Sequence, residues 1–569
     1  MSAKQNELEV AAELWFRDFG GRPDSGEDAG PAMRRAIEAA AAMKSAVRLI
    51  LEPGRYDFYA DTAEKAVYYI TNTASEEENP YPLKTIAIFM KRLCDFTLDG
   101  NGALFMFHGK VTMFAVDQCE GIVIHNLKTD FARPTVVEMK IENLGQDFID
   151  VIVHPDSRYS IRDGKLVWMG ENWQFSDGLM QACDLSANTT WRIDNMLEQA
   201  SYAEELSSRR LRFHYEQFPQ VPLSKNWLLQ ARDGIRDQVG IFIHRSKNIQ
   251  LTNVSLHFMH GLGIVGQYSE NLSFRQLDLS PRMEACRSVA AFADFIHLSG
   301  CRGKVEIKNS RFVGSHDDAV NVHGTHLRIV AQPSPNQVVV RFMHAQTYGF
   351  EAFDEGDEIE FVRGRSLMPF ASNKVTHTEM VSKRELLLTL AHPVPDGVEE
   401  GDVLENVTWT PEVEIRDNYF ARIPTRGILV TTRRKVVIAG NVFERLQMSA
   451  VLVADDAAYW YESGRVENLM IRENQFIKCG GPDVPIIAIA PEIEEAEQCE
   501  PVHHNITILY NVFVLPTQDT LVLDAKSTRS LDFRRNTVRA GASLVQVEDA
   551  VRLVACSNIS MEENRLETI

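Results

Sequence analysis

The sequence lacks long hydrophobic runs and an excess of positive charge, and both absences limit what the protein can bind. No stretch approaches the length of a membrane span, and the start, MSAKQNELEV, lacks the apolar core of a secretory signal. Acidic residues number 79 against 59 basic ones, which gives a formal net charge of −20. Such a charge repels phosphate backbones and anionic lipids. We therefore expect a neutral ligand, with no nucleic acid or membrane partner.

The absence of a signal also bears on location and assembly. As the sequence stands, it predicts a soluble cytoplasmic protein, or a periplasmic or secreted one if a signal has been removed. An elongated acidic protein can also associate with itself, so the sequence is compatible with either a monomer or a homo-oligomer.

Paired cysteines are missing as well. No two of the eight cysteines form a C-x-x-C pair, which excludes a zinc knuckle or a dithiol redox motif. We expect mostly reduced, buried thiols at these scattered positions: Cys94, Cys119, Cys183, Cys286, Cys301, Cys479, Cys499 and Cys556.

Helical periodicity is confined to one segment near the start. An Ala-rich stretch follows Pro31 and runs to Ala46, and its apolar residues recur at helical spacing: Met33, Ile37, Ala40 and Met43. No convincing long helix follows. A chain of 569 residues exceeds the size of one ordinary hydrophobic core. The protein is therefore expected to form several domains or an elongated repeat of strands.

Internal repeats in the C-terminal half favour the second possibility. An Asn-x-(Phe/Val) unit recurs after an apolar strand, with consecutive units between 23 (441 − 418) and 37 (511 − 474) residues apart, at Asn418, Asn441, Asn474, Asn511 and Asn536. Strands and turns without a helix, in units of this length, predict the coils of a parallel β-helix. Asn at such a turn tolerates left-handed backbone and can hydrogen-bond its neighbours above and below. A propeller would need a more regular period.

Two stretches break the repeat and divide the chain. Residues 132–232 and 327–408 lack the Asn rhythm and alternate apolar with polar residues, which predicts small antiparallel barrels or sandwiches inserted into the solenoid. The remaining parts are then 1–131, with a capping helix and the first coils, 233–326 and 409–569. The capping helix would cover an open sheet edge.

Three carboxylates gather in the coils of residues 233–326. Asp294 and Asp317 are 23 (317 − 294) residues apart, and Asp318 adds a second acid beside Asp317. On neighbouring coils their strands would lie about 4.8 Å apart. Grouped carboxylates resist joint ionisation, and enzymes use such groups as an acid and a base across one bond. The alternative is an Asx turn at Asp317 that bonds only local N–H groups.

Four histidines accompany these acids: His297, His316, His323 and His326. No H-E-x-x-H or other tight ligand spacing is present, so the pattern predicts hydrogen-bonded histidines in a polar cleft rather than metal ligands. The rival interpretation is a calcium site, as in polysaccharide lyases, with Asp317 and Asp318 among its oxygen ligands.

A loop near residue 460 suits a sugar. Trp460 and Glu462 lie in the run AYWYESG, where aromatic faces can stack on a sugar ring and a carboxylate can bind its hydroxyls. The alternative is a loop that packs its aromatics on an inserted domain. Arg426 is either a hydroxyl donor or solvated charge.

These residues resemble a known family. The runs ADFIH at 293–297, CRG at 301–303 and DDAVNVHGTH at 317–326 resemble glycoside hydrolase family 110, bacterial α-1,3-galactosidases that remove terminal galactose from blood-group-B-type and linear α-galactosyl glycans. The resemblance covers nearly the whole chain. It implies an all-β fold, a right-handed parallel β-helix with two small β-barrel insertions.

The resemblance also implies a reaction. It implies hydrolysis with inversion and without metal or other cofactor, in which Asp294 is the general acid and the Asp317/Asp318 pair activates water. We expect sugar contacts from the histidines, arginine and loop residues described above: His297, His316, His323, Arg426, Trp460 and Glu462.

Two other functions remain to be weighed. A polygalacturonase-like hydrolase or a calcium-dependent lyase would act on an acidic polysaccharide and would need a cleft rich in Lys and Arg. A non-catalytic β-helix, such as an adhesin or a tailspike-like binder, would have no reason to stack three carboxylates on neighbouring coils.

Overall fold

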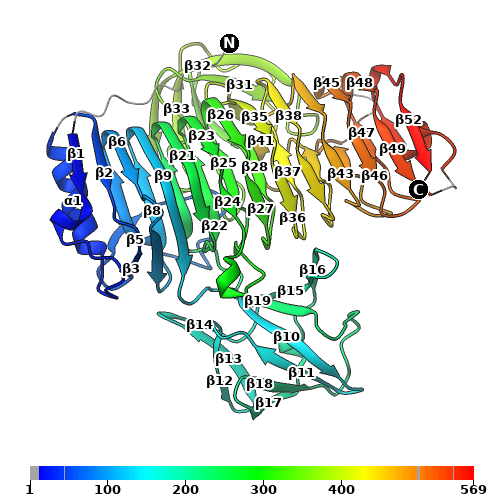
Figure 1. Ribbon diagram of the computed structural model, residues 1–569. Coiled ribbons are helices and arrows are strands. Elements are labelled where there is room, and N and C mark those ends of the chain that lie inside the picture. Colours follow the sequence, from blue (N-terminus) through cyan, green and yellow to red (C-terminus); the bar gives the residue numbers. More distant parts are fainter. Residues whose placement is uncertain (1–11, 44, 495, 497–499, 542–543, 569) are drawn as a thin grey trace.

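The computed structural model describes residues 12–43, 45–494, 496, 500–541 and 544–568. The start MSAKQNELEV and Cys499 lie outside these residues. Most strands of the described chain pair in parallel and stack coil upon coil, which confirms the predicted parallel β-helix. Figure 1 shows the coils following one another from the helix α1 (Gly30–Met43, blue) to the strand β52 (Arg565–Thr568, red).

Each coil contributes one strand to each of three stacks. In the C-terminal half one coil consists of β35 (Pro411–Arg416), β36 (Tyr419–Ala421) and β37 (Ile428–Val430). These pair in parallel with β38 (Val436–Ala439), β39 (Val442–Glu444) and β40 (Val451–Val453) of the next coil. Val413 lies beside Val436, a shift of 23 (436 − 413) residues. The shortest sequence spacing is therefore one coil, and loops account for the longer ones.

The other strands of the solenoid fall into the same three stacks. The first stack also contains β1 (Ala12–Trp15), β2 (Val47–Ile50), β6 (Cys94–Asp99), β9 (Glu120–Phe131), β21 (Lys247–Leu256), β23 (Glu270–Arg275), β26 (Arg302–Lys308), β42 (Leu469–Arg472), β45 (His503–Leu509), β48 (Thr528–Arg534) and β51 (Ser557–Ser560). The second contains β3 (Arg55–Tyr59), β7 (Leu104–His108), β24 (Asp278–Leu279), β27 (Arg311–Val313), β43 (Gln475–Ile477), β46 (Val512–Val514), β49 (Thr537–Ala540) and β52.

The third stack is the one that matters for the site. Its strands are β4 (Glu64–Val67), β5 (Leu83–Lys91), β8 (Thr112–Asp117), β20 (Val239–His244), β22 (Leu262–Gln267), β25 (Ile296–Ser299), β28 (Val320–Thr325), β37, β40, β44 (Ile487–Ile489), β47 (Leu523–Lys526) and β50 (Val551–Val554). In the run GLGIVG at 261–266, which superficially suggests a dinucleotide fingerprint, residues 262–266 belong to β22, so the run is not a phosphate loop.

A ladder of buried asparagines fixes the stacking of the C-terminal coils. The Oδ1 of each repeat Asn after the first accepts two bonds from the Asn of the coil before it. The Nδ2 of that Asn donates at 3.0–3.1 Å, and its backbone N–H donates at 2.9–3.0 Å. The ladder consists of Asn418, Asn441, Asn474, Asn511 and Asn536. Asn564 extends the ladder. The bonds between neighbours are as predicted.

The ladder asparagines do not use the left-handed backbone that Asn tolerates at a turn. Left-handed φ values occur at the preceding residues instead, for example at Asp417, Glu473 and Tyr510. The turn therefore bends one residue before the Asn, whose side chain is left free to face its neighbours. Upstream, Asn248 and Asn271 do adopt left-handed backbone themselves.

A stack of phenylalanines fills the interior beside this ladder. Ring centroids are 4.8–5.0 Å apart and nearly parallel along Phe312, Phe420, Phe443, Phe476 and Phe513. These rings are fully buried. The Phe of the repeat unit therefore supplies the core, while the Asn two residues earlier supplies the register.

The helix α1 covers the N-terminal end of the solenoid, as predicted. Ala32, Met33, Ala36, Ile37 and Ala40 are buried in the core shared with the first coils. Met43 does not belong to this apolar face, because 42% of it is exposed. In the described residues the only other α-helix is the single turn α2 (Met196–Gln199).

The first insertion leaves the solenoid after β9 and returns at β20. It contains a seven-stranded antiparallel sheet of β16 (Thr189–Ile193), β15 (Leu179–Asp184), β19 (Leu228–Arg232), β10 (Val137–Leu144), β11 (Phe148–Val153), β18 (Arg210–His214) and β17 (Tyr202–Ser207), and a three-stranded sheet of β12 (Arg158–Arg162), β13 (Lys165–Gly170) and β14 (Trp173–Phe175). Figure 1 shows it projecting from the solenoid.

This insertion has the sandwich form that its sequence allows, and not the closed barrel that the family resemblance implies. No closed barrel is formed by its described strands; the two sheets bury one shared core that includes Ile149, Val151 and Trp168. The second, smaller sheet covers the apolar face of the first, so the closure of a barrel is not needed.

The second insertion is a closed barrel. Its strands follow the order β29 (Leu327–Ser334), β30 (Gln337–Arg341), β33 (Glu385–Leu390), β32 (Pro369–Met380), β31 (Glu358–Val362) and β34 (Val403–Asn406). Its core takes in Tyr268 of the solenoid. The barrel is thereby packed onto the coils next to β28.

The seven described cysteines are free thiols, and four of them are buried: Cys119, Cys183, Cys301 and Cys479. The expectation of mostly reduced, buried thiols is met at these four. Cys94 and Cys286 are exposed instead. None of the described helices has the length and apolar character needed to cross a membrane.

Removing one rung of the ladder should destabilise the solenoid. In Asn474→Ala, the N–H and side chain of Asn441 lose the Oδ1 that accepts from both, and the carbonyl of Ile438 loses its donor. Each buried polar group left without a partner costs about 1–3 kcal/mol. We expect thermal and urea unfolding to show a loss of about 3 kcal/mol or more.

The neighbouring substitution Gln475→Ala is the control. Gln475 is exposed on the same coil, and surface changes of this kind usually stay within about 0.5 kcal/mol. Equal stability of the two variants would contradict a structural role for the ladder.

Candidate active site

Three site residues occupy the same place on three successive coils. Asp294, Asp318 and Arg426 each stand two residues before the start of a strand of the third stack, β25, β28 and β37. Ile296 pairs with Val320, and Val320 with Ile428. The offset between the first two coils is therefore 24 (320 − 296) residues, which places Asp318 level with Asp294. Asp317 lies one residue further from the start of β28. The spacing of 23 residues inferred from the sequence is off by one here.

Asp294 is a buried acid with a high pKa. It is 4% exposed, and its backbone is held by the bond from Gly263 N–H to its carbonyl at 2.8 Å. Burial, together with the negative charge of Asp317, raises the pKa of Asp294 to about 7. This carboxyl can therefore hold a proton near neutral pH.

A line of two histidines runs away from Asp294. His297 Nδ1 lies 2.8 Å from Asp294 Oδ2, and His297 Nε2 lies 2.9 Å from His323 Nε2. His323 Nδ1 lies 2.6 Å from the carbonyl oxygen of Gly324. Both rings are buried, and burial lowers the pKa of each, that of His297 to about 4.

Asp317 is surrounded by positive charge. Arg236 Nη2 donates to its Oδ2 at 2.7 Å and Arg192 Nη2 to its Oδ1 at 3.1 Å. Burial opposes ionisation, but the guanidinium groups of Arg236 and Arg192 outweigh it and hold the pKa of Asp317 below its ordinary value. Asp317 is therefore ionised, and both of its oxygens are occupied.

Asp318 has a different environment from its neighbour. The N–H and Nε of Arg426 donate to Asp318 Oδ1 at 3.0 and 3.1 Å. Burial raises the pKa of Asp318 to about 6, against the charge of Arg426 and with the help of Asp317 and Asp294. The acidic pair is thus no simple Asx turn, and Arg426 is not merely solvated charge.

Glu462 enters from the loop that folds back over β28. It belongs to the short strand β41 (Glu462–Ser463), which pairs antiparallel with β28. Asn72 Nδ2 donates to Glu462 Oε1 at 2.7 Å, and Asn321 Nδ2 at 3.4 Å. His323 Nε2 lies 3.6 Å from the same oxygen. Glu462 therefore lies beside the histidines that bond Asp294.

One group of residues has the makings of a metal site. Among the described residues, ligand-type atoms of His297, His323 and Glu462 lie within 4.8 Å of one another. A metal would need the lone pair of each Nε2, but the two Nε2 atoms share a hydrogen bond, in which one of them carries a proton. The geometry therefore reads as a hydrogen-bonded network.

His316 lies on the far side of the acidic pair. Its Nδ1 accepts from Arg232 Nε at 3.3 Å, and its Nε2 lies 3.0 Å from Gln230 Oε1. Burial and the charge of Arg232 keep its pKa well below the ordinary value. Both ring nitrogens of His316 are thus bonded to side chains of the first insertion. His326 Nδ1 lies 3.0 Å from the carbonyl oxygen of Asp456.

Trp460 forms an exposed platform beside the site. It is 45% exposed, and its ring lies 4.3 Å from that of His344, which comes from the barrel insertion. The carboxylate of Asp456 accepts from the N–H groups of Ala458 and Tyr459 at 2.6 and 2.9 Å and so holds the loop.

Sequence reasoning missed Asn72, Arg192 and Arg236. They come from the N-terminal segment, the first insertion and the return to the solenoid, and they fall in no repeat. Only the topology brings them to Glu462 and Asp317. The position of Asn72 between two threonines, with left-handed backbone, is the one local signal.

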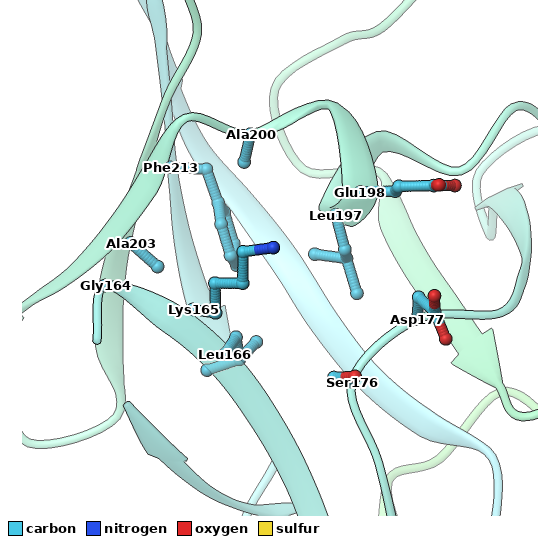
Figure 2. Close-up of a pocket in the computed structure, with 10 residues that line it drawn as sticks. All are labelled: Gly164, Lys165, Leu166, Ser176, Asp177, Leu197, Glu198, Ala200, Ala203 and Phe213. Atoms are coloured by element: carbon cyan, nitrogen blue, oxygen red, sulfur yellow. The ribbon is translucent and has the colours of Figure 1, made fainter. Parts of the chain in front are cut away.

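A separate hollow lies within the first insertion (Figure 2). Lys165, Asp177 and Glu198 line it together with apolar side chains from β13, α2 and β18. None of the acidic or histidine residues described above takes part in it.

Known proteins resemble the chain over most of its length. The family description "GLAA-B beta-barrel domain II" matches residues 337–404, within the barrel insertion. An "Alpha-1,3-galactosidase A" of Bacteroides thetaiotaomicron is 42% identical over 96% of this chain and 95% of its own. An "Alpha-1,3-galactosidase B" of the same organism is 33% identical over 99% of this chain and 92% of its own.

Among solved structures, the A-module of the Azotobacter vinelandii mannuronan C-5 epimerase AlgE4 aligns with a TM-score of 0.42 and 9% identity, over 98% of this chain and 97% of its own. The two galactosidases are far closer in sequence and match nearly end to end. This chain belongs to the α-1,3-galactosidase family, the glycoside hydrolase family 110 that its motifs resemble.

Proposed function

We propose that the protein is an exo-acting α-galactosidase that hydrolyses terminal α-1,3-linked galactose from oligosaccharides or glycans, of B-antigen type or linear, with inversion and without metal. One observation carries the proposal: Asp294 is buried against His297, whereas Asp317, on the next coil, accepts from the guanidinium groups of Arg192 and Arg236. These surroundings raise the pKa of Asp294 and lower that of Asp317. Glycoside hydrolysis needs one protonated carboxyl and one ionised carboxylate in the same site. The names of the relatives supply the sugar and the linkage.

The reaction balances with these residues. Asp294 gives its proton to the glycosidic oxygen as the bond to the anomeric carbon breaks, and the acceptor leaves as an alcohol. Water attacks that carbon from the opposite face and loses a proton to the base, so one acid is consumed and one is formed. Carboxyls of an inverting site lie about 6.5–9.5 Å apart, whereas strands lie about 4.8 Å apart. The side chains of Asp294 and the base must therefore diverge.

Asp318 is the better base of the acidic pair. Both oxygens of Asp317 are engaged by Arg192 and Arg236, and an acid held so firmly ionised is a weak base. The pKa of Asp318, about 6, lies near an ordinary working pH. Asp317 then keeps negative charge beside the reacting centre and helps to keep Asp294 protonated.

The surroundings favour a neutral sugar over an acidic one. A polygalacturonase-like or lyase site needs free positive charge for a uronate, but Arg192, Arg236 and Arg426 are paired with Asp317 and Asp318. Trp460 offers an exposed ring for a sugar face, and Glu462 offers a carboxylate for its hydroxyls. We assign both to substrate binding.

Removing either the acid, Asp294, or the base, Asp318, should nearly abolish turnover. We expect wild-type protein to release galactose from nitrophenyl α-galactoside and a B-type trisaccharide, but not from the β-galactoside. Asp294→Asn and Asp318→Asn should each lower kcat/KM by at least about 100-fold, since positioned acids and bases contribute about 10²–10⁴-fold.

The control for this experiment is Gln475→Ala, an exposed position two coils beyond that of Arg426 and in the second stack. Activity should survive EDTA in wild type. Full activity in both Asp variants, with folding intact by circular dichroism, would sink the proposal.

The pH profile follows from the two shifted acids. Asp294 must be protonated, so kcat/KM should fall as pH rises through about 7, where its raised pKa lies. Asp318 must be ionised, so kcat/KM should fall as pH drops through about 6. The two values overlap, so the profile should be a narrow bell. An acid limb only below about pH 4 would transfer the role of base to Asp317.

Inversion has its own measurement. Since water attacks opposite the leaving group, an α-galactoside should give β-galactose first. Proton NMR of a fast reaction should show the β-anomeric signal before mutarotation produces the α signal. Initial α product would rule out inversion and would require a covalent intermediate.

A further inference from the structure

The hydrogen-bond chain behind Asp294 has a fixed direction at one end. The carbonyl oxygen of Gly324 can only accept, and it lies 2.6 Å from His323 Nδ1. His323 therefore carries a hydrogen on Nδ1. A neutral imidazole has only one N–H, so His323 must present a bare Nε2 to its other neighbour.

This direction passes through the second ring. His297 Nε2 lies 2.9 Å from His323 Nε2, and such a contact contains one proton, because two lone pairs or two protons would repel. Since His323 accepts, His297 donates from Nε2. Both rings are neutral near neutral pH, because burial lowers the pKa of each. His297 consequently turns a bare Nδ1 towards Asp294.

The bare Nδ1 determines the state of the acid. Asp294 Oδ2 lies 2.8 Å from it, and only a protonated carboxyl can donate there. We infer that His297 and His323 are positioning residues that hold Asp294 in its protonated form in the free enzyme. The inference rests on the proposed function for its catalytic meaning. His323 touches no oxygen of Asp294 and acts only by fixing the tautomer of His297.

The chain has one alternative with the same number of protons. If Asp294 Oδ2 passed its proton to His297 Nδ1, and His297 Nε2 passed one to His323 Nε2, Asp294 would be a carboxylate and His323 a cation. Glu462, 3.6 Å from His323 Nε2, would favour this state. It would also create two buried charges and place Asp294 against ionised Asp317, which is costly.

Other charges near Asp294 act on both states. The groups that face it are Asp317, Asp318 and Glu462, which favour the protonated acid, and Arg236 and Arg426, which favour the carboxylate. Arg236 and Arg426 are already paired with Asp317 and Asp318. The acceptor nitrogen of His297 thus adds to an environment that already disfavours a second negative charge.

The test is the variant His323→Leu, which removes the acceptor for His297 Nε2. His297 can then carry its hydrogen on Nδ1 and donate to the Asp294 carboxylate, which favours ionisation. A hydrogen bond to a charged group shifts a pKa by about one unit or more. The basic limb of kcat/KM, which reports the free enzyme, should move down by about one pH unit or more. A merely structural effect would lower activity at every pH and leave the limb in place, which would overturn the inference.

The matched control is His503→Leu. His503 is also fully buried, and its Nδ1 accepts from Val466 N–H at 3.0 Å in a different part of the solenoid. The basic limb of kcat/KM for His503→Leu should lie at the same pH as that of the wild type. A shift equal to that of His323→Leu would also overturn the inference, because the loss of any buried histidine would then suffice.

A second measurement needs neither turnover nor a folded His323 variant. The infrared difference spectrum between wild type and Asp294→Asn at about pH 6 should contain the C=O band of a protonated carboxyl. Its absence, or one equivalent of bound metal in wild type by elemental analysis, would overturn the inference. Absence of galactosidase activity in wild type would instead reject the proposed function, and the infrared band would still decide the state of Asp294.

Discussion

The parallel register between coils is the constraint on which the rest of the structure depends. In this solenoid a shift of one residue would turn every side chain of a strand from the core to the surface. The asparagine ladder prevents that shift, because each Asn accepts two bonds from the coil before it and donates to the coil after it. Its first rung, Asn418, accepts from Ser310 N–H and donates to Ile307. The ladder thereby ties the coil of Asp317 and Asp318 to the coil of Arg426.

Register in turn sets the charge states of the site. Asp294, Asp318 and Arg426 hold equivalent places on consecutive coils, so their separations follow from strand spacing and not from flexible loops. One position further out, Asp317 meets Arg192 and Arg236 from outside the stack. Adjacent residues of one turn thus end with opposite pKa shifts. The fold distinguishes these two carboxyls by giving Asp317 the guanidinium groups of Arg192 and Arg236, and Asp318 the backbone N–H and Nε of Arg426.

Much of this could be predicted from the sequence, and the limits have physical causes. The repeat of Asn and Phe predicted the solenoid, since each coil repeats the same inward contacts, and the interval between Asp294 and Asp317 predicted that the three acids lie on neighbouring coils. Asn72, Arg192 and Arg236 could not be found in this way, because they reach the site from outside the repeat. The local spacing of 23 residues also misled by one position, because the coil between β25 and β28 is one residue longer than the coil between β35 and β38.

The two insertions have unequal parts in the site. The first supplies Arg192 and surrounds His316 through Gln230 and Arg232, so it acts on the side of the ionised acid. The barrel supplies Thr347, whose hydroxyl donates to Asn72 Oδ1 at 2.8 Å, and Asn72 holds Glu462 on the side of the protonated acid. A bare β-helix would leave both faces open to water, where carboxylates of one kind titrate alike. The two insertions place different partners on the two sides, and the different pKa shifts of Asp294 and Asp317 arise from them as much as from the coils.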